Sequence, residues 1–304
     1  MKDNGFVKVL LIVGLVFLVL GGTIFTVAMF ANKWDFTVLS SHVQEKQVVE
    51  ITNEDEIATI EKIDLKLSTA DVKYLYHDEN KIIIEGYKLC SRKGELFEEV
   101  STKIENGTLS IRLDRKKVSW FQIGAFGENQ IIIKMPKDMK VELSVELSTG
   151  DVFIGESNKS YVFSNINITT STGDVSLVGD INCQTANIKN STGDTYINGK
   201  LTVNNFTRNA DTGDFIVNAK INADKITVSN TTGEVICNAY ITANLIDVET
   251  STGDITLKLL GSKSDYSYTY DISTGDSNIS AFISGAKQIK VIASTGDANI
   301  YFER

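Results

Sequence analysis

The stretch Ser148-Thr149-Gly150-Asp151 decides the fold, because it returns at a nearly constant interval through the second half of the chain. Identical copies lie at residues 171–174, 191–194, 251–254, 273–276 and 294–297, and variants that keep the glycine lie at 211–214 and 231–234. The eight glycines are Gly150, Gly173, Gly193, Gly213, Gly233, Gly253, Gly275 and Gly296, spaced 20 to 23 residues apart. An interval of about 20 residues is typical of a solenoid in which each repeat contributes one coil.

Apolar residues recur in phase with these glycines. Seven residues before and four residues after each glycine the side chain is apolar in all eight repeats, as at Phe206 and Val217. Five residues before the glycine it is apolar or aromatic in seven repeats, and Arg208 is the exception. Positions two residues apart share one face of a strand. We therefore predict an all-β fold, a parallel β-helix of three-strand coils about 4.8 Å apart, with its eight coils in residues 141–304.

The repeated motif has the chemistry of a tight corner. We expect its glycine to adopt a positive φ, and its Asp, Ser and Thr side chains to bond nearby backbone N–H groups. Stacking would align the acidic residues into a row, and calcium, which takes several oxygen ligands, is the alternative role for that row. The calcium hypothesis concerns Asp151, Asp174, Asp194, Asp214, Glu234, Asp254, Asp276 and Asp297.

A long apolar run near the N-terminus predicts a transmembrane helix over residues 9–31. This run of 23 residues has no formal charge, and about 20 apolar residues suffice to cross a bilayer. Lys2 and Lys8 precede the run, which favours a short cytoplasmic tail over residues 1–8 and an extracytoplasmic C-terminal part. We therefore predict a single-pass protein of the cell membrane.

Trp34 and Phe36, which follow the apolar run, suit the aromatic belt at a membrane interface. The alternative is a cleaved signal peptide, with Thr26-Val27-Ala28 as a weak cleavage sequence. The repeats lie outside the cytoplasm under either interpretation.

Residues 32–58 are polar and mixed, which predicts a stalk, and residues 59–140 predict an irregular β region that caps the solenoid. Residues 63–74 include Ser-Thr-Ala-Asp, so we expect a degenerate coil there with Ala70 in place of the glycine. Residues 98–108 and 119–129 have the composition of loops.

Basic and aromatic residues occur together in the predicted cap region, and two interpretations remain open. The aromatic side chains would pack into the cap, or the group would contact anionic lipid or polymer. The residues are Arg112, Arg115, Lys116, Lys117, Trp120, Phe121 and Phe126.

Composition excludes several classes of function. A net charge of −9 argues against a nucleic-acid partner. Cys90, Cys183 and Cys237 form no C-x-x-C pair, so we expect small core or surface residues and no disulfide or metal framework. No hydrolase, P-loop or dinucleotide motif is present, and we expect neither an enzyme nor a cofactor. Arg208 is the one break in the repeat beside the motif, and one residue does not make a catalytic site.

The chain resembles the bacterial adhesin-like domain family of unknown function. The resemblance rests on an N-terminal membrane segment, the strand-like sequence Ile131-Ile132-Ile133-Lys134-Met135-Pro136, residues 141–151, and the serial Ser-Thr-Gly-Asp coils. It covers residues 60–304 and implies an anchored or exported envelope protein with a β-solenoid. The family defines no catalytic residues, so none are transferred.

These observations predict a non-enzymatic, adhesin-like binding or scaffold protein of the bacterial envelope, whose partner is an envelope polymer or a protein. The first alternative is an accessory protein of an envelope-stress system. The second is a carbohydrate-active β-helix enzyme, because some parallel β-helices cleave polysaccharides with carboxylates in a groove.

Overall fold

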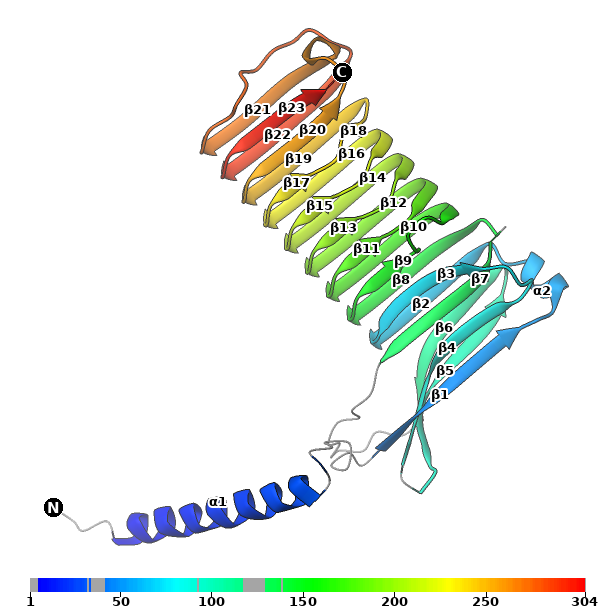
Figure 1. Cartoon of the computed structure of the whole chain (residues 1–304), viewed down its shortest axis with the longest axis vertical. Coiled ribbons are helices and arrows are strands. Elements are labelled where there is room, and N and C mark those ends of the chain that lie inside the picture. The colour runs from blue at the N-terminus through cyan, green and yellow to red at the C-terminus, as the bar shows by residue number, and fades with distance from the viewer. Residues whose placement is uncertain are drawn as a thin grey trace. The chain divides into compact units, whose positions relative to one another are not determined.

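The computed structural model describes residues 5–31, 33, 42–91, 93–116, 129–137 and 139–303. Two compact units divide the chain. One consists of residues 1–45, 89–97 and 116–128, and the other of residues 46–88, 98–115 and 129–304, which includes all the repeats. The repeats form a ladder of stacked strands (Figure 1). The chain is therefore mostly β, with one long helix at its start.

That helix, α1, spans Gly5–Ala31 and is long and apolar enough to cross a membrane by length and composition. It begins four residues before the predicted span, and the described side chains from Ile12 to Ala31 are nearly all exposed. Trp34 and Phe36 lie outside the described residues.

The predicted stalk is wrong for its second half. Residues 42–58 contain strand β1 (His42–Ile51) and the short helix α2 (Glu54–Ala58). Val49 and Ile51 pack against the main core, and β1 pairs with β4 (Ile82–Ser91). The charged residues between the valines obscure the strand period in the sequence, so composition alone suggested a linker.

The region before the repeats combines parallel and antiparallel pairing. Strands β2 (Lys62–Thr69) and β3 (Asp71–His77) form the coil that lacks a glycine, and they pair in parallel with β8 (Val141–Thr149) and β9 (Val152–Ile154). On their other side they pair in parallel with β6 (Thr108–Arg115) and β7 (Gln130–Pro136). Antiparallel pairs join β4 to β7 and β5 (Leu96–Glu105) to β6.

The predicted loop over residues 98–108 is also wrong, because β5 and β6 form a hairpin there. The turn is Asn106-Gly107, and both residues have positive φ, 47° and 73°. Asn-Gly between two strands is the strongest short-range hairpin signal, so the sequence did contain the information. Most of the other predicted loop, residues 119–129, lies outside the described ranges.

Each inner repeat consists of one short and one long strand. The short strands are β9, β11 (Val175–Leu177), β13 (Thr195–Ile197), β15 (Phe215–Val217) and β17 (Val235–Cys237). The long strands are β10 (Ser160–Thr172), β12 (Asp180–Thr192), β14 (Leu201–Thr212) and β16 (Ile221–Thr232). Strands of one kind pair in parallel with the same kind in the next coil, in direct register. This parallel stacking of coils confirms the predicted β-helix.

The second and third predicted strands of a coil are joined into the one long strand. In β12 the buried apolar residues are Ile181 and Cys183, then Ala186 and Ile188. The step of three between Cys183 and Ala186 interrupts the alternation of two, so the strand bends there and turns a second segment onto the same core. In the coil of Gly253 the bend becomes a break, between β18 (Ile241–Thr242) and β19 (Leu245–Thr252).

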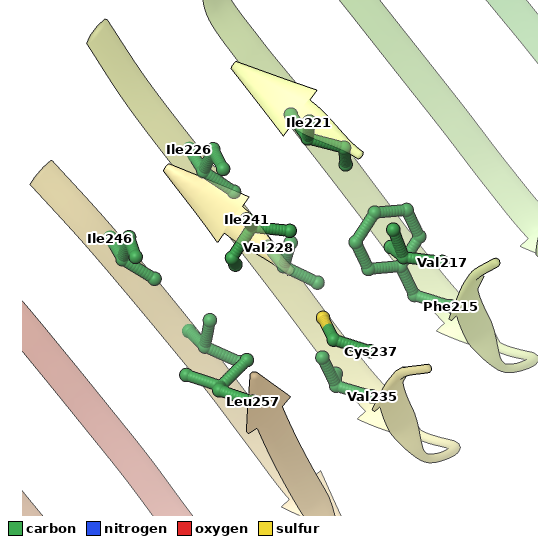
Figure 2. A pocket seen from close by; sticks show the side chains of 11 residues that line it. Phe215, Val217, Ile221, Ile226, Val228, Val235, Cys237, Ile241, Ile246 and Leu257 are labelled. Atoms are coloured by element: carbon green, nitrogen blue, oxygen red, sulfur yellow. The ribbon is translucent and has the colours of Figure 1, made fainter. Parts of the chain in front are cut away.

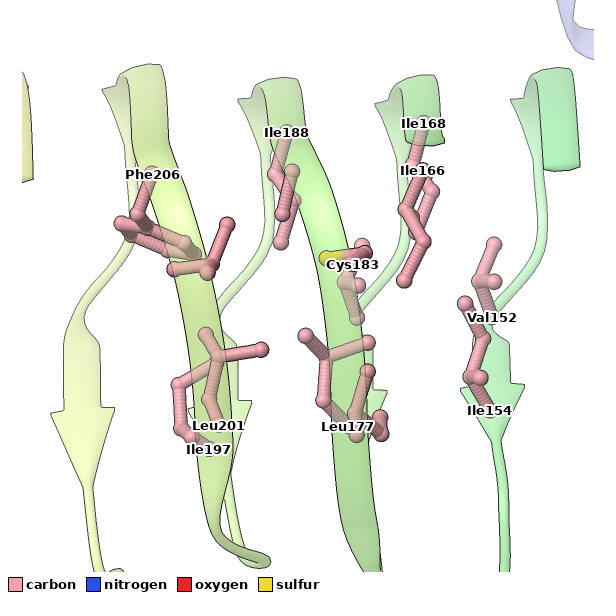
Figure 3. Close-up of a cluster of buried hydrophobic side chains, with 14 of the residues drawn as sticks. Val152, Ile154, Ile166, Ile168, Leu177, Cys183, Ile188, Ile197, Leu201 and Phe206 are labelled. Atoms are coloured by element: carbon pink, nitrogen blue, oxygen red, sulfur yellow. The ribbon is translucent and has the colours of Figure 1, made fainter. Parts of the chain in front are cut away.

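A continuous apolar core runs along the stack. Side chains from successive coils lie side by side along the stack, as those of Ile168, Ile188 and Phe206 do in Figure 3. All eight residues seven positions before a glycine are buried, and so are seven of the eight residues four positions after it. Ile279 is half-buried. One coil could not hide its apolar face alone, and its neighbours on both sides cover it.

The last two coils are stacked out of sequence order. Their strands are β20 (Ile255–Leu260), β21 (Tyr266–Thr274), β22 (Lys287–Thr295) and β23 (Ala298–Glu303), with a 3₁₀ turn, η2, at Lys263–Asp265. Strand β19 pairs with β22, and β22 pairs with β21. The coil of Gly296 therefore lies between those of Gly253 and Gly275, and the coil of Gly275 ends the stack. The repeats are serial in sequence and not in space.

Candidate functional site

The repeat glycines lie at corners that no other residue can occupy without displacement. Their φ angles lie between 136° and 143°. A Cβ added to any of them would lie 2.0 to 2.3 Å from a carbonyl oxygen of the preceding coil, which for Gly173 is the oxygen of Gly150. Both the backbone angle and this close approach require glycine. The glycine is therefore required both by the local turn and by the contact with the neighbouring coil.

The acidic residue after most of the repeat glycines bonds to the next coil of the stack. Asp174 N–H donates to Asp151 Oδ1 at 2.8 Å, and Asp194 N–H donates to Asp174 Oδ1 at the same distance. Equivalent bonds begin at Asp71 and end at Asp276. No bond of this kind is described between Glu234 and Asp254, where the acidic side chain is one methylene longer. We expected bonds within each turn, whereas the structure places them between turns, so the row ties the coils together.

The calcium hypothesis for this row stays a prediction. Within the described residues no group of three or more His, Cys, Asp and Glu side chains could hold a metal ion. One oxygen of most of these carboxylates already accepts an N–H bond, which leaves the second oxygen for the surface.

A row of apolar side chains runs beside the carboxylates on the outside of the short strands. Residues three positions after the glycines are paired in direct register from coil to coil. Their side chains alternate with the buried residues of each strand and so point outward. Phe153, Tyr196, Ile216 and Ile236 are half-buried there. A polar residue would be the usual choice at such a position, and three coils in succession carry a large apolar one.

A row of amides completes this surface. Asn218 Nδ2 donates to Asn198 Oδ1 at 2.8 Å, and Asn238 Nδ2 donates to Asn218 Oδ1 at 2.8 Å. The Tyr196 hydroxyl donates to Asp194 Oδ2 at 2.8 Å and so links the apolar row to the carboxylates. That bond raises the pKa of the Tyr196 phenol to about 12. We define the short-strand face as the residues one, three and five positions after the first six repeat glycines. These residues lie in, or directly flank, β9, β11, β13, β15, β17 and β20.

The outward residues of the long strands form a different, polar surface. They are mainly Asn, Thr, Ser and Lys, and some bond to the same position in the next coil. Asn187 Nδ2 donates to Asn167 Oδ1 at 2.9 Å, and Thr185 Oγ1 donates to Asn165 Oδ1 at 2.7 Å. The two surfaces thus differ mainly in the apolar row.

Arg208, the break in the repeat, points into the core and is fully buried. Its guanidinium donates to Asn230 Oδ1 and to the carbonyl oxygens of Gly213 at 3.1 Å and Asp214 at 3.3 Å. Burial lowers the pKa of Arg208 to about 10, against the opposing charges of Asp194 and Asp214. No salt bridge to Arg208 is present in the described part of the chain. Because every contact is to the protein itself, the side chain is not available to a substrate.

The cavity described inside the repeats, between β15 and β20, is too small for a ligand. Eleven apolar side chains surround a cavity of about 10 Å³ between β15 and β20, and Phe215, Cys237 and Leu257 are among them (Figure 2). That volume is at most the size of one water, and an apolar cavity stays dry. All three cysteines are free and buried. Burial raises the pKa of the Cys183 and Cys237 thiols to about 12, so neither is a nucleophile.

The basic residues of the predicted lipid or polymer contact are engaged with the protein where the structure describes them. Arg112 pairs with Asp64 and donates to its carbonyl oxygen at 2.6 Å. Arg115 Nε donates to Glu98 Oε2 at 2.5 Å. Lys117, Trp120, Phe121 and Phe126 lie outside the described residues. The two described arginines therefore have structural partners.

Two open hollows lie near the first coils. One of about 620 Å³ is lined by Glu54, Asp55 and Lys140 over Ile57 and Ile60. The other, of about 250 Å³, is lined by Tyr76, His77, Asp78, Lys137, Lys159 and Ser160. Lys137 pairs with Asp78 at 3.2 Å and Lys159 with Glu156 at 2.6 Å, so the bases of the second hollow are partly neutralised. Neither hollow repeats along the stack.

Comparison with known proteins places the chain in a family. The profile of Toastrack DUF4097 matches residues 60–301. A candidate adhesin from Bacteroides fragilis has 16% identity and a TM-score of 0.50, over 85% of this chain and 97% of its own. A candidate lipid-binding protein from Parabacteroides distasonis has 16% identity and a TM-score of 0.52, over 84% of this chain and 96% of its own. At such identities the structures show a shared fold. No curated protein matches the chain.

Proposed function

Because the chain belongs to the Toastrack DUF4097 family, we propose that it is a non-enzymatic, adhesin-like binding protein of the bacterial envelope. The short-strand face is its binding surface. One observation carries this proposal, the outward apolar row of Phe153, Tyr196, Ile216 and Ile236 between a row of carboxylates and a row of amides. The carboxylate row has a member in every one of these coils, whereas Ser176 interrupts the apolar row and the amide row covers the coils of Gly193, Gly213 and Gly233. The rows follow the spacing of the coils, so the surface suits a ligand that also repeats.

The ligand is a neutral, extended polysaccharide. Sugar rings offer C–H faces that pack on aromatic and aliphatic side chains, and their hydroxyls bond to carboxylates and amides. A row of six acidic residues between Asp151 and Asp254 repels a polyanion, and the chain as a whole has a net charge of −9. Charge therefore favours a neutral glycan over an anionic wall polymer.

The proposal has no catalytic step. The acidic residues of the face occupy equivalent positions, and all but Glu234 accept the same bond from the next coil, so none stands out as a general acid or base. The related structures are described as a candidate adhesin and a candidate lipid-binding protein, which are binding roles. An acyl chain has no place inside the solenoid, where the cavity is about 10 Å³.

Anchoring by α1 places this surface outside the cell. The apolar helix over Gly5–Ala31 acts as an uncleaved single-pass anchor, with the N-terminus in the cytoplasm and the repeats on the other side. The face is thus held close to the polymers of the envelope.

The test measures binding of the full-length protein in lipid nanodiscs to insoluble cellulose and chitin, with heparin as the polyanion. Sedimentation should recover the protein with a neutral glycan and not with heparin. Phe153→Ala and Tyr196→Ala should each weaken binding about tenfold, because both remove an aromatic packing surface. Empty nanodiscs give the background.

Val162→Ala is the matched control, because Val162 is an outward apolar residue of β10 and is 40% exposed. Its binding should equal that of the wild type. Equal losses in all three variants, or binding to heparin alone, would contradict the assignment of the short-strand face.

A further inference from the structure

The coil of Gly275 ends the stack and has a partner on one side only. Strand β21 pairs in parallel with β22. On its open side, Tyr268 exchanges two backbone bonds with Phe282, at 2.8 and 3.0 Å, so a returning segment covers the first half of the strand. Beyond Tyr268 the second half of β21 is largely exposed, from Tyr270 to Thr274. An exposed strand edge is a template for another strand.

Three polar groups that are paired in the inner coils have no partner here. In the coil of Gly173, the glycine N–H donates to Thr192 and the Val175 N–H donates to Asp194, both at 2.9 Å. The Asp174 carboxylate accepts the Asp194 N–H. The counterparts in the last coil are the N–H groups of Gly275 and Ser277 and the carboxylate of Asp276. Nothing in the described ranges bonds to these three groups on the open side.

The same end also exposes apolar and acidic side chains. Ile283 is 87% exposed and Tyr270 is 41% exposed. Asp271 and Asp276 are exposed beside them, and Gly275 is exposed where the other seven repeat glycines are half-buried. The end therefore offers backbone donors, an apolar patch and negative charge together, which is the composition of a protein interface.

We propose that this open end binds an extended strand of a partner protein, which adds to β21 in parallel as one further half-coil. The geometry of the inner coils defines the partner's chemistry. The partner strand has a carbonyl oxygen that accepts the Gly275 N–H and an N–H that donates to the Asp276 carboxylate. It has a glycine at the position where the Cβ of any other residue would clash with the Gly275 carbonyl oxygen. A basic side chain complements Asp271 and Asp276.

A second copy of this chain fits the site less well. At the other end of the stack β2 and β3 already pair with β6 and β7, so head-to-tail stacking has no open coil to use. Two copies related by a twofold axis would pair their β21 strands antiparallel, and would bring Asp271 and Asp276 of each copy close together. The observations therefore favour a different chain.

The probe is a synthetic peptide with the sequence of residues 290–300, which carries an inner corner, Ser294-Thr295-Gly296-Asp297, and the basic Lys290. Fluorescence anisotropy of the labelled peptide measures its binding to the full-length protein in nanodiscs. We expect saturable binding that Asp276→Ala in the protein weakens about tenfold, because a bond to a charged group is lost. Ile283→Asp should weaken it by a similar factor.

Matched controls distinguish specific binding of the peptide from non-specific binding. The peptide with Gly296→Val should not bind, because a Cβ at an inner corner would lie about 2 Å from the neighbouring carbonyl, as at Gly193 and Gly213. A scrambled peptide should not bind either. Asp174→Ala removes a carboxylate from the middle of the row and should leave peptide affinity unchanged.

Binding of the valine or scrambled peptide as strong as that of the parent would overturn the proposal. A concentration-dependent dimer that Ile283→Asp abolishes would also overturn it, in favour of a second copy. Glycan binding by the short-strand face is measured separately, and the Asp276 variant should retain it.

Discussion

At the scale of single residues, the corner glycine and the acidic residue after it do different work. The glycine accepts a backbone angle and a close approach, since a Cβ on Gly213 would lie 2.0 Å from the Gly193 oxygen. The acidic residue carries a hydrogen bond from one coil to the next, as Asp194 does to Asp214. The coil at Ala70 has no glycine, yet it keeps the hydrogen bond to the next coil, because Asp71 still accepts the Asp151 N–H at 2.9 Å.

We predict that Gly213→Ala lowers the free energy of unfolding by about 4 kcal/mol, because it adds both a positive-φ alanine and a clash with backbone. Gly94→Ala is the control for the angle alone. Gly94 has φ +83° and nothing within 4 Å of an added Cβ, so a loss of about 1 kcal/mol is expected. Urea unfolding followed by circular dichroism measures both. Equal losses would mean that the carbonyl contact is unimportant.

Arg208 is the residue whose role the repeat pattern could not give. It extends into the core beside Ala210, which occupies the position held by Asn190 and Asn230 in the neighbouring coils. Among the described residues its buried charge has hydrogen bonds but no carboxylate partner, so its burial costs more solvation free energy than that of a paired charge would. The fold therefore tolerates an arginine at this repeat position, but the arginine does not add to its stability.

We predict that the double change Arg208→Ile and Ala210→Asn, which copies Ile188 and Asn190 of the preceding coil, raises stability by about 1–3 kcal/mol. Burial lowers the wild-type pKa of Arg208 from its usual value to about 10. The unfolded chain therefore binds more protons above about pH 10, and wild-type stability rises relative to the variant. The advantage of the variant should be constant between about pH 6 and 9 and shrink at higher pH.

Urea unfolding at several pH values measures this advantage. Arg208→Ala alone should instead lose about 2–3 kcal/mol, because it leaves Asn230 and Thr195 without their partner. A double variant less stable than wild type at neutral pH would show that Arg208 contributes to stability.

At the scale of elements, the order of the last strands distinguishes the structure from a serial solenoid. In strand pairing, the coil of Gly253 is followed by the coil of Gly296, because β19 pairs with β22. Strand β21 pairs with β22, and the Tyr266 hydroxyl of β21 also donates to the Leu260 carbonyl oxygen at 3.0 Å. The final strands of the chain therefore hold the preceding coil in place.

We predict that truncation after residue 286, which removes β22 and β23, releases β21 as well. Hydrogen exchange of the full-length and truncated proteins measures this. Amides of residues 266–274 should lose protection, while those of β14 and β16 keep it, because stability in a stacked array is largely a nearest-neighbour property. Retained protection of residues 266–274 would indicate that the coils can stack in sequence order.

At the scale of the whole molecule, an apolar helix precedes a repeat array with a closed interior. The core of the described coils is apolar and closely packed, and both proposals therefore concern the outside of the stack. The short-strand face repeats once per coil, and the end at Gly275 occurs once. The first suits a repeating polymer and the second a single partner.

We predict that the N-terminus lies in the cytoplasm and the repeats lie outside the cell. Labelling of intact cells with a membrane-impermeant maleimide tests this orientation. The native cysteines are buried, so the wild type should remain unlabelled. Ser191→Cys, at an exposed site of the repeats, should react in intact cells, and Asn4→Cys only after permeabilisation. Labelling of Asn4→Cys in intact cells would contradict a cytoplasmic N-terminus, and its absence from the mature protein would indicate cleavage.

The sequence by itself determined the repeat, the inward positions and the parallel stacking. The period of the glycine motif and the alternation of two are properties of each coil, and each coil must bury the same face. The sequence also located the apolar helix and the degenerate coil at Ala70. The sequence also predicted that the acidic residues form a row, because residues at equal spacing in the sequence are aligned when the coils pair in direct register.

Only the tertiary structure decided how the coils meet. The bonds from each acidic side chain to the next coil, the burial of Arg208 and the exchange of the last two coils depend on which strands become neighbours. A period specifies a coil and its face but not the neighbour on either side, since all the coils present nearly the same edge. The Ser-Thr-Gly-Asp motif therefore fixed the shape of each coil, and strand pairing fixed the order of the stack and its open end.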